Sequence, residues 1–143
     1  MQFWKDLIQL LSSALAVIVA AFAVFNYYRS RKLEAARWAL QLYEKFYEKD
    51  ALKDIRRILD SNTPNDPSVA KLVSEEPDNF TDYLNFFEFI AFLQFRGQMA
   101  KDDVNTLFSY YLGCLRKHPA VYTYVTDRSK GYEQLSQMLQ QRA

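Results

Sequence analysis

Residues 7–28 read LIQLLSSALAVIVAAFAVFNYY, a run of 22 residues that carry no formal charge. An α-helix rises about 1.5 Å per residue, so this run would be roughly 33 Å long, enough to cross a hydrocarbon core of about 30 Å. Backbone polar groups in lipid must pair within their own segment, which for a single run requires a helix. The sequence therefore predicts a transmembrane helix.

Aromatic residues flank this apolar run at both ends. Phe3 and Trp4 lie before it, and Tyr27 and Tyr28 are its last two residues. Rings with an apolar body and a polar edge favour the headgroup zone of a bilayer. We expect these four residues to be interfacial anchors.

Basic residues cluster after the run, at Arg29, Arg31, Lys32 and Arg37, and we expect them to contact anionic lipid headgroups. Residues 1–32 carry four basic residues and one acidic residue, a net charge of +3. The rest of the chain carries 14 basic and 16 acidic residues, a net charge of −2. The positive-inside bias then predicts a single-pass protein of the cell inner membrane whose C-terminal domain is cytoplasmic.

The apolar run is also compatible with a cleaved signal peptide or with a buried core helix. A signal peptide needs a small-x-small site, which Ala21-Phe22-Ala23 would supply, but the residues before the run are nearly neutral and the run continues past that site. The core helix of a soluble protein is the second alternative, because a buried helix is also apolar. The flanking aromatic and basic residues favour the membrane anchor.

Small and polar side chains recur along one stripe of the expected membrane helix. They are spaced by three or four residues, at Gln9, Ser13, Ala16, Ala20 and Ala23. Helices in lipid associate through the close approach of small residues and through hydrogen bonds, because the hydrophobic effect does not drive them together there. We therefore expect these residues to form the seam of a homo-oligomer.

The rest of the sequence predicts an all-α protein, since apolar residues recur with helical spacing and glycine and proline are few. The membrane helix is expected to continue to about Glu48 and to lead into an antiparallel bundle of about four or five helices. The expected domains are a transmembrane anchor with its basic cluster, 1–32, and a cytoplasmic helical domain, 33–143. Later helices are expected at 51–59, 80–93, 102–118 and 132–141. Residues 69–76 are expected to form one or two weak helical turns, and residues 121–125 are ambiguous.

Turn-forming residues predict a loop at 61–67. Asp78 or Asn79 is expected to cap the helix that contains residues 80–93, and Gly97 stands where the residue after its C-cap belongs. This helix is apolar almost all round, so we expect it at the centre of the domain.

The composition leaves little room for catalytic chemistry. One cysteine, one histidine and three isolated glycines exclude most zinc sites, iron–sulfur clusters, disulfide scaffolds and phosphate-binding loops. Cys114 and His118 are four residues apart on one expected helix, so a reactive or metal-binding pair is an alternative to a buried thiol beside a helix-terminal imidazole. We expect no catalytic residue, metal or cofactor, and the net charge of +1 gives no reason to expect nucleic acid as a partner.

Glu88 is the most informative acidic residue, because Phe86, Phe87, Phe89 and Phe92 surround it in the sequence. An unpaired buried carboxylate costs several kcal/mol, so we expect a buried structural ion pair. A general acid with a raised pKa is the functional alternative. The candidate basic partners are Arg37, Arg56, Arg57 and Arg116.

The stretch 85–93, NFFEFIAFL, followed by Arg96-Gly97, Asp103-Val104 and residues 108–111, FSYY, resembles bacterial families of short proteins with one N-terminal membrane helix and a small helical domain. In architecture the chain is similar to the membrane accessory proteins of type VI-B CRISPR systems, whose helical domain is HEPN-like. This resemblance implies oligomeric membrane pores in antiphage defence.

The ribonuclease signature of HEPN domains places an arginine four to six residues before a histidine. Here Leu112 and Gly113 stand at such distances before His118, and Arg116 is too close to it. We expect a non-enzymatic membrane protein that self-associates through its N-terminal helix, with the lipid bilayer and further copies of the chain as partners. The alternatives are an anchored adaptor that tethers a cytosolic partner protein and a degenerate HEPN-like ribonuclease that depends on His118.

Overall fold

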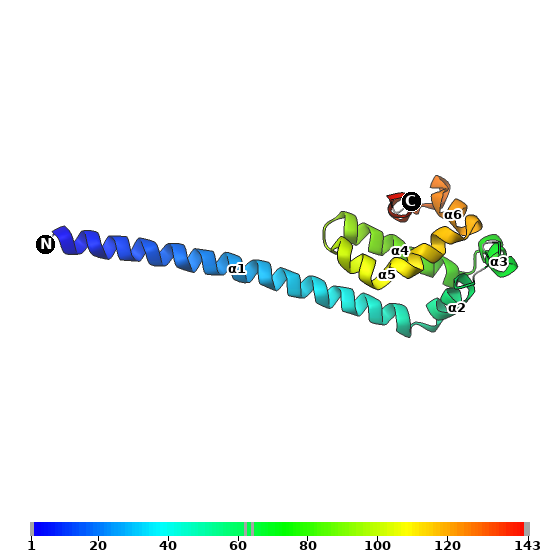
Figure 1. Ribbon diagram of the computed structural model, residues 1–143, viewed down its shortest axis with the longest axis horizontal. Helices are drawn as coiled ribbons and strands as arrows, with labels where there is room; N and C mark the ends of the chain where they lie inside the picture. The colour runs from blue at the N-terminus through cyan, green and yellow to red at the C-terminus, as the bar shows by residue number, and fades with distance from the viewer. Residues whose placement is uncertain (1, 62, 64, 142–143) are drawn as a thin grey trace. The chain divides into compact units, whose positions relative to one another are not determined.

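The protein is all-α in its computed structural model, which describes residues 2–61, 63 and 65–141. Its first helix is also its longest, α1 (Gln2–Glu48), which the ribbon shows from blue to cyan (Figure 1). The later elements are α2 (Asp50–Leu59), α3 (Pro67–Glu75), α4 (Asp78–Phe95), α5 (Lys101–Lys117), α6 (Pro119–Thr126), a short 3₁₀ helix (Arg128–Lys130) and α7 (Glu133–Gln141). The expected fold class, a long N-terminal helix followed by packed helices, is confirmed.

The chain divides into two compact units, Met1–Trp38 and Ala39–Ala143. The boundary falls within α1 and six residues after the expected one at residue 32. Burial explains this position, because Ala39 is the first buried side chain in the part of α1 that the structure describes. From Ala39 onward, the last turns of α1 belong to the second unit, which we call the helical unit.

The core of the helical unit is built around Phe46 of α1, which is completely buried. Its ring stacks on Phe86 of α4, with centroids 5.1 Å apart, and meets the edges of Tyr111 and Phe108 of α5 at 4.8 and 5.8 Å. Aromatic pairs in such offset and edge-to-face arrangements add stability beyond the area that they bury. Phe46 therefore joins α1 to both α4 and α5.

The end of α1 is stabilised by Arg56 from the following helix. Arg56 donates from Nη1 to the Phe46 carbonyl at 2.9 Å and from Nη2 to the Tyr47 carbonyl at 3.3 Å. The last carbonyls of a helix have no partner within it, so a cation at this position satisfies them and suits the negative end of the helix dipole. The guanidinium also lies 4.7 and 4.5 Å from the Phe46 and Tyr47 ring centroids.

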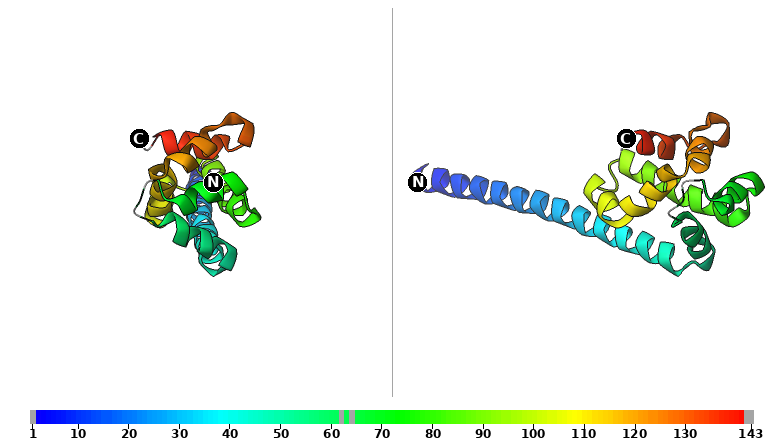
Figure 2. Two further views of the ribbon diagram at one scale, coloured as in Figure 1. Left: turned by 90° about the vertical axis from the view of Figure 1, so that its right-hand side faces the viewer. Right: turned by 45° about the vertical axis from the view of Figure 1, so that its right-hand side comes forward.

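Helix α4 lies at the centre of the unit, as expected, in contact with α2, α5 and α7 (Figure 2). It begins at Asp78 rather than after it, with Pro77 in the N-cap position and no side-chain cap, so the expected cap by Asp78 or Asn79 is wrong. Asp78 instead lies in the first turn, where its charge complements the helix dipole. Gly97 has a φ of 67° and follows the C-cap as expected, with Gln98 N–H donating to the Leu93 carbonyl at 2.9 Å.

The bundle contains more helices than the expected four or five, because two short segments are fully helical. Residues 67–75 form α3, whose N-cap Asp66 accepts a hydrogen bond from Ser68 N–H at 2.8 Å. Residues 119–126, which include the ambiguous stretch, form α6 with Pro119 in its first turn. Residues 62 and 64 of the expected loop lie outside the described residues.

Replacing Phe46 with alanine should remove the contact between α1, α4 and α5. We expect Phe46→Ala to lower the free energy of unfolding of the helical unit by about 3–5 kcal/mol, as for other buried aromatic residues. Leu40→Ala, on the same helix but 57% exposed, should change it by no more than about 0.5 kcal/mol. Chemical denaturation of the full chain in mild detergent, followed by near-UV circular dichroism, measures both; equal losses would contradict the assigned core.

Candidate membrane anchor

One helix in the described part of the chain is long and apolar enough to cross a membrane, and it is α1. None of the side chains in its most apolar window is buried. Large apolar residues along it, such as Leu15 and Phe22, are more than half exposed. The core helix of a soluble protein would bury these side chains against its neighbours, so the exposed surface is consistent with a membrane anchor and opposes the core-helix alternative.

The expected interfacial residues are exposed at both ends of the apolar run. Phe3 and Trp4 form an edge-to-face pair with ring centroids 6.0 Å apart, and Tyr27 and Tyr28 form a second pair at 6.0 Å. The guanidinium of Arg31 lies 5.6 Å from the Tyr27 ring centroid. The tyrosine pair and the beginning of the basic cluster therefore lie together on the helix surface.

The other residues of the basic cluster, Arg29, Lys32 and Arg37, are also exposed. The ion pairs found within residues 2–61, 63 and 65–141 involve other side chains. Exposed cations beside an apolar helix are suited to contact with anionic headgroups.

The five seam residues, from Gln9 to Ala23, are exposed on the isolated chain. The hydroxyls of Ser12 and Ser13 both donate to the Gln9 carbonyl, at 2.9 and 2.8 Å. Each serine proton is thus used within the helix, which is a common arrangement for serine in lipid-facing helices. The Gln9 side-chain amide has N–H donors that could reach a neighbouring helix. The Ser13 hydroxyl oxygen can still accept a hydrogen bond.

Glu88 has a different partner from the expected arginine. It is half-buried, and its Oε1 and Oε2 accept from the backbone N–H groups of Gln134 and Leu135, at 3.0 and 2.7 Å. These amides lie in the first turn of α7, where unpaired N–H groups and the helix dipole favour an anion. The expected buried ion pair of Glu88 is therefore replaced by these two hydrogen bonds. The ion pairs of the described residues do not include Glu88, and the candidate partner Arg56 instead donates to the last carbonyls of α1.

The Cys114 and His118 side chains are both buried in the helical unit. Burial raises the pKa of the Cys114 thiol, which opposes formation of the reactive thiolate. His118 is completely buried, and its Nε2 lies 2.9 Å from the Leu59 carbonyl, so Nε2 carries a proton and donates it. Lys117 Nζ donates to the Ser61 carbonyl at 2.5 Å, so the basic end of α5 caps the end of α2. No cluster of described residues could hold a metal ion.

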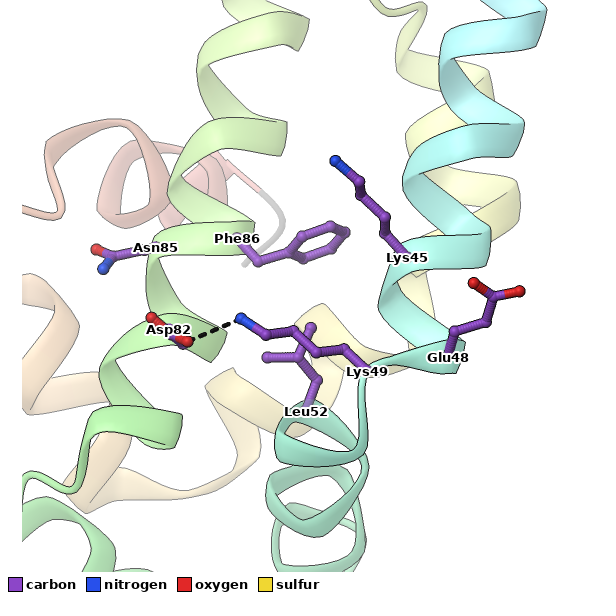
Figure 3. A pocket seen from close by; sticks show the side chains of 7 residues that line it. All are labelled: Lys45, Glu48, Lys49, Leu52, Asp82, Asn85 and Phe86. Carbon is purple, nitrogen blue, oxygen red and sulfur yellow. Dashed lines mark hydrogen bonds and ion pairs between the residues drawn. The ribbon is translucent and has the colours of Figure 1, made fainter.

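An open cleft of about 620 Å³ lies between the last turn of α1, the start of α2 and one face of α4 (Figure 3). Lys45 and Phe86 project into it from α1 and α4, and Lys49 Nζ reaches Asp82 Oδ2 at 2.8 Å across its lower end. Sequence analysis missed this cleft, because its two walls come from segments that are at least 30 positions apart and share no local pattern. The remaining lining residues are Glu48, Leu52 and Asn85.

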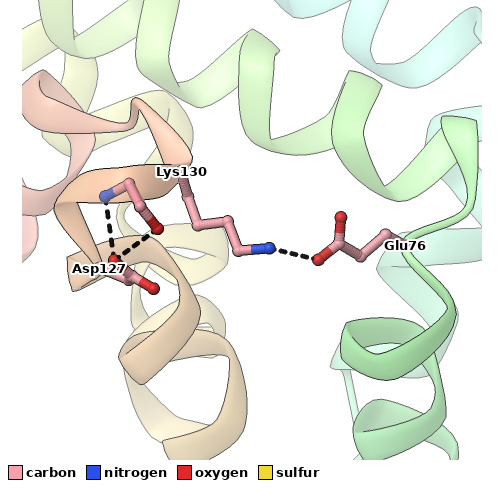
Figure 4. A network of polar contacts seen from close by, with 4 residues as sticks. Glu76, Asp127 and Lys130 are labelled. Atoms are coloured by element: carbon pink, nitrogen blue, oxygen red, sulfur yellow. Dashed lines mark hydrogen bonds and ion pairs between the residues drawn. The ribbon is translucent and has the colours of Figure 1, made fainter.

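A second polar contact joins the end of α3 to the 3₁₀ helix (Figure 4). Lys130 Nζ donates to Glu76 Oε1 at 2.5 Å and lies 4.6 Å from the Tyr124 ring centroid. The hydrogen bond from Lys130 lowers the pKa of the Glu76 carboxyl and raises the pKa of the Lys130 amine. Both side chains are partly exposed, so this pair is a structural contact rather than a reactive centre.

Comparisons with protein families, curated proteins and solved structures found no match to this chain.

Removing the Glu88 carboxylate should loosen α7. We expect Glu88→Ala to lower the free energy of unfolding by about 1–3 kcal/mol, because two backbone donors lose a charged acceptor. Hydrogen exchange should quicken at residues 133–136 more than in α5. Glu44→Ala, an exposed acid on α1, is the control and should leave exchange in α7 unchanged. Unchanged exchange in α7 of Glu88→Ala would contradict the assigned cap.

The Glu76–Lys130 pair should contribute to acid sensitivity. Because the folded pKa of Glu76 lies below its usual 4.5, its contribution to stability is present above that pH and is lost as the pH falls through the folded value. We expect Glu76→Gln to lower the thermal midpoint at neutral pH and to lose less stability than the parent between about pH 5 and pH 3. If the thermal midpoints of the parent and of Glu76→Gln fell in parallel as the pH is lowered, this role of Glu76 would be refuted. Glu75→Gln, which changes an exposed acid, is the control and should follow the parent.

Proposed function

We propose that this protein is a single-pass protein of the cell inner membrane that is held in the bilayer by α1. The observation that carries the proposal is the exposure of the large apolar side chains of α1 between Ile8 and Phe25, together with aromatic pairs at both ends of the run. The basic cluster that begins at Arg29 supports a cytoplasmic helical unit through the positive-inside bias.

The stripe from Gln9 to Ala23 supports self-association of the membrane helices. Alanines at positions 16, 20 and 23 allow two backbones to approach, and the Gln9 amide supplies donors for a neighbouring helix. The protein then acts as an oligomer whose helical units are gathered at the cytoplasmic surface.

The role is proposed to be non-enzymatic. Complete burial of His118 and its bond to the Leu59 carbonyl leave this imidazole poorly placed for a substrate, and the raised pKa of Cys114 disfavours nucleophilic catalysis. The burial of His118 also counts against the degenerate ribonuclease, which would depend on this imidazole.

The resemblance to the accessory proteins of type VI-B CRISPR systems supports a finer proposal, in which the oligomer perturbs or opens the membrane during antiphage defence. A ring of associated helices would bring Gln9 and Ser13 of several copies together inside the bilayer, where polar side chains favour water. The open cleft beside Lys45 favours the second candidate function, an adaptor that tethers a cytosolic protein.

Bulky residues in the seam should separate the membrane helices. We expect Ala16→Leu/Ala20→Leu to reduce the oligomer mass of the detergent-solubilised protein, because leucine prevents close backbone approach. Ala14→Leu/Ala21→Leu is the matched control, since helical spacing puts both positions on the opposite face, and its mass should stay that of the parent. Light scattering coupled to size exclusion measures all three; an unchanged mass in the seam variant would refute the seam.

Dye release from vesicles that contain the parent or the seam variant separates the pore from the adaptor. The pore proposal expects release by the parent and about tenfold less by Ala16→Leu/Ala20→Leu, if the oligomer forms the conducting state. An adaptor predicts no release from either protein.

The orientation is tested by labelling a single cysteine with an impermeant maleimide in a Cys114→Ala background. We expect Ser109→Cys, exposed on α5, to react in spheroplasts only after the membrane is permeabilised, and Lys5→Cys to react before it. The reverse pattern would place the helical unit outside.

A further inference from the structure

Four tyrosines form a chain of contacting rings and hydroxyls where the end of α1 meets α5. The rings of Tyr43 and Tyr47, one turn apart on α1, lie with centroids 4.5 Å apart. The Tyr47 and Tyr111 hydroxyls are hydrogen-bonded to each other at 2.5 Å. The Tyr111 ring meets the edge of its neighbour Tyr110 on α5, with centroids 5.3 Å apart. Each phenol therefore contacts the next, and we call these four side chains the tyrosine chain.

Tyr110, at one end of this chain, has a different hydrogen-bond partner from Tyr47 and Tyr111. Its hydroxyl donates to Asp60 Oδ1 at the end of α2, and this bond raises the pKa of Tyr110 to about 12. The Cys114 thiol lies beside the same hydroxyl. A hydrogen bond to an ionised acceptor is stronger than one between two neutral hydroxyls. The Tyr110 phenol is thus paired with a carboxylate.

A carboxylate partner makes a phenol easier to oxidise. When a phenol loses an electron its hydroxyl becomes a strong acid, so the electron leaves readily only if a base takes the proton. Asp60 is in hydrogen-bond contact with the Tyr110 proton and can accept it. The negative charge of Asp60 also favours the loss of an electron from the adjacent ring. Of the four phenols, Tyr110 should therefore be the one on which an oxidising equivalent comes to rest.

We propose that the tyrosine chain is a radical sink, which takes an oxidising equivalent at Tyr47 and holds it on Tyr110. The oxidant is a peroxyl radical, and Tyr47, which is 40% exposed, is open to it. The peroxyl radical takes the hydrogen atom of the Tyr47 hydroxyl and leaves as a hydroperoxide. Tyr111 then gives its own hydroxyl hydrogen atom to the Tyr47 oxygen along their hydrogen bond.

The second transfer moves an electron and a proton by separate routes. Tyr110 gives an electron to the Tyr111 ring and its proton to Asp60, and the Tyr111 oxygen regains a proton from water. Asp60 later returns its proton to the solvent. The net change is one hydrogen atom moved from Tyr110 to the peroxyl radical. All the residues involved belong to the helical unit, so the inference does not depend on the proposed membrane anchor or its seam.

Radical trapping on the full chain in mild detergent tests this inference. Peroxyl radicals from a water-soluble azo initiator, supplied below the protein concentration, are followed by a nitroso spin trap and peptide mass spectrometry. In the parent, Tyr110 should carry about tenfold more label than Tyr47, the ratio that a charged hydrogen bond supplies. Tyr111→Phe keeps the ring but removes the hydroxyl, so the label on Tyr47 should rise about tenfold.

Asp60→Asn removes the proton acceptor, and the labels on Tyr110 and Tyr47 should then become about equal. Asp54→Asn, which changes an exposed acid of α2, is the matched control and should keep the ratio of the parent. Near-UV circular dichroism checks that each variant is folded.

Other results would overturn the inference. A Tyr47 label that Tyr111→Phe leaves unchanged would show that each tyrosine is oxidised on its own. A ratio of labels that Asp60→Asn leaves unchanged would remove the reason for Tyr110 as the sink. A label on Cys114 in place of Tyr110 in the parent would put the end of the transfer on the thiol instead.

Discussion

The apolar surface of α1 is the constraint on which the rest of the protein depends. Ten large apolar side chains between Ile8 and Phe25 are more than half exposed. Burying a side chain of this kind contributes roughly 1.5–3 kcal/mol, so leaving the whole set in water would cost on the order of 10 kcal/mol or more. This cost is comparable to the total stability of a small domain. A bilayer removes the cost without any further protein contact.

Within the helical unit, polar side chains from neighbouring helices cap several helix ends. Arg56 of α2 satisfies the final carbonyls of α1, Lys117 and His118 satisfy the end of α2, and Glu88 of α4 satisfies the first amides of α7. The short helices of this unit have little stability alone, because forming a first turn is unfavourable. Caps supplied by neighbouring helices therefore tie their formation to the packing around Phe46.

Features decided by neighbouring residues were predictable from the sequence, and features decided by distant ones were not. The apolar run and the glycine after α4 are local, and each is where the pattern placed it. Glu88 was correctly identified as needing compensation, but its partner lies 46 and 47 residues away in backbone amides, which carry no side-chain signal. The sequence pattern shows that α4 is apolar almost all round, but not that its neighbours leave Phe89 and Phe92 partly exposed.

Residence of α1 in lipid is tested most directly by alkaline carbonate extraction of membranes from cells that make the full chain. This treatment strips proteins that are held by charge or by contact with other proteins, and it leaves those whose apolar helix crosses the hydrocarbon core. The account predicts that the intact chain stays in the membrane pellet. Release of the intact chain into the supernatant would contradict it, and with it the oligomer seam and the orientation that follow from the anchor.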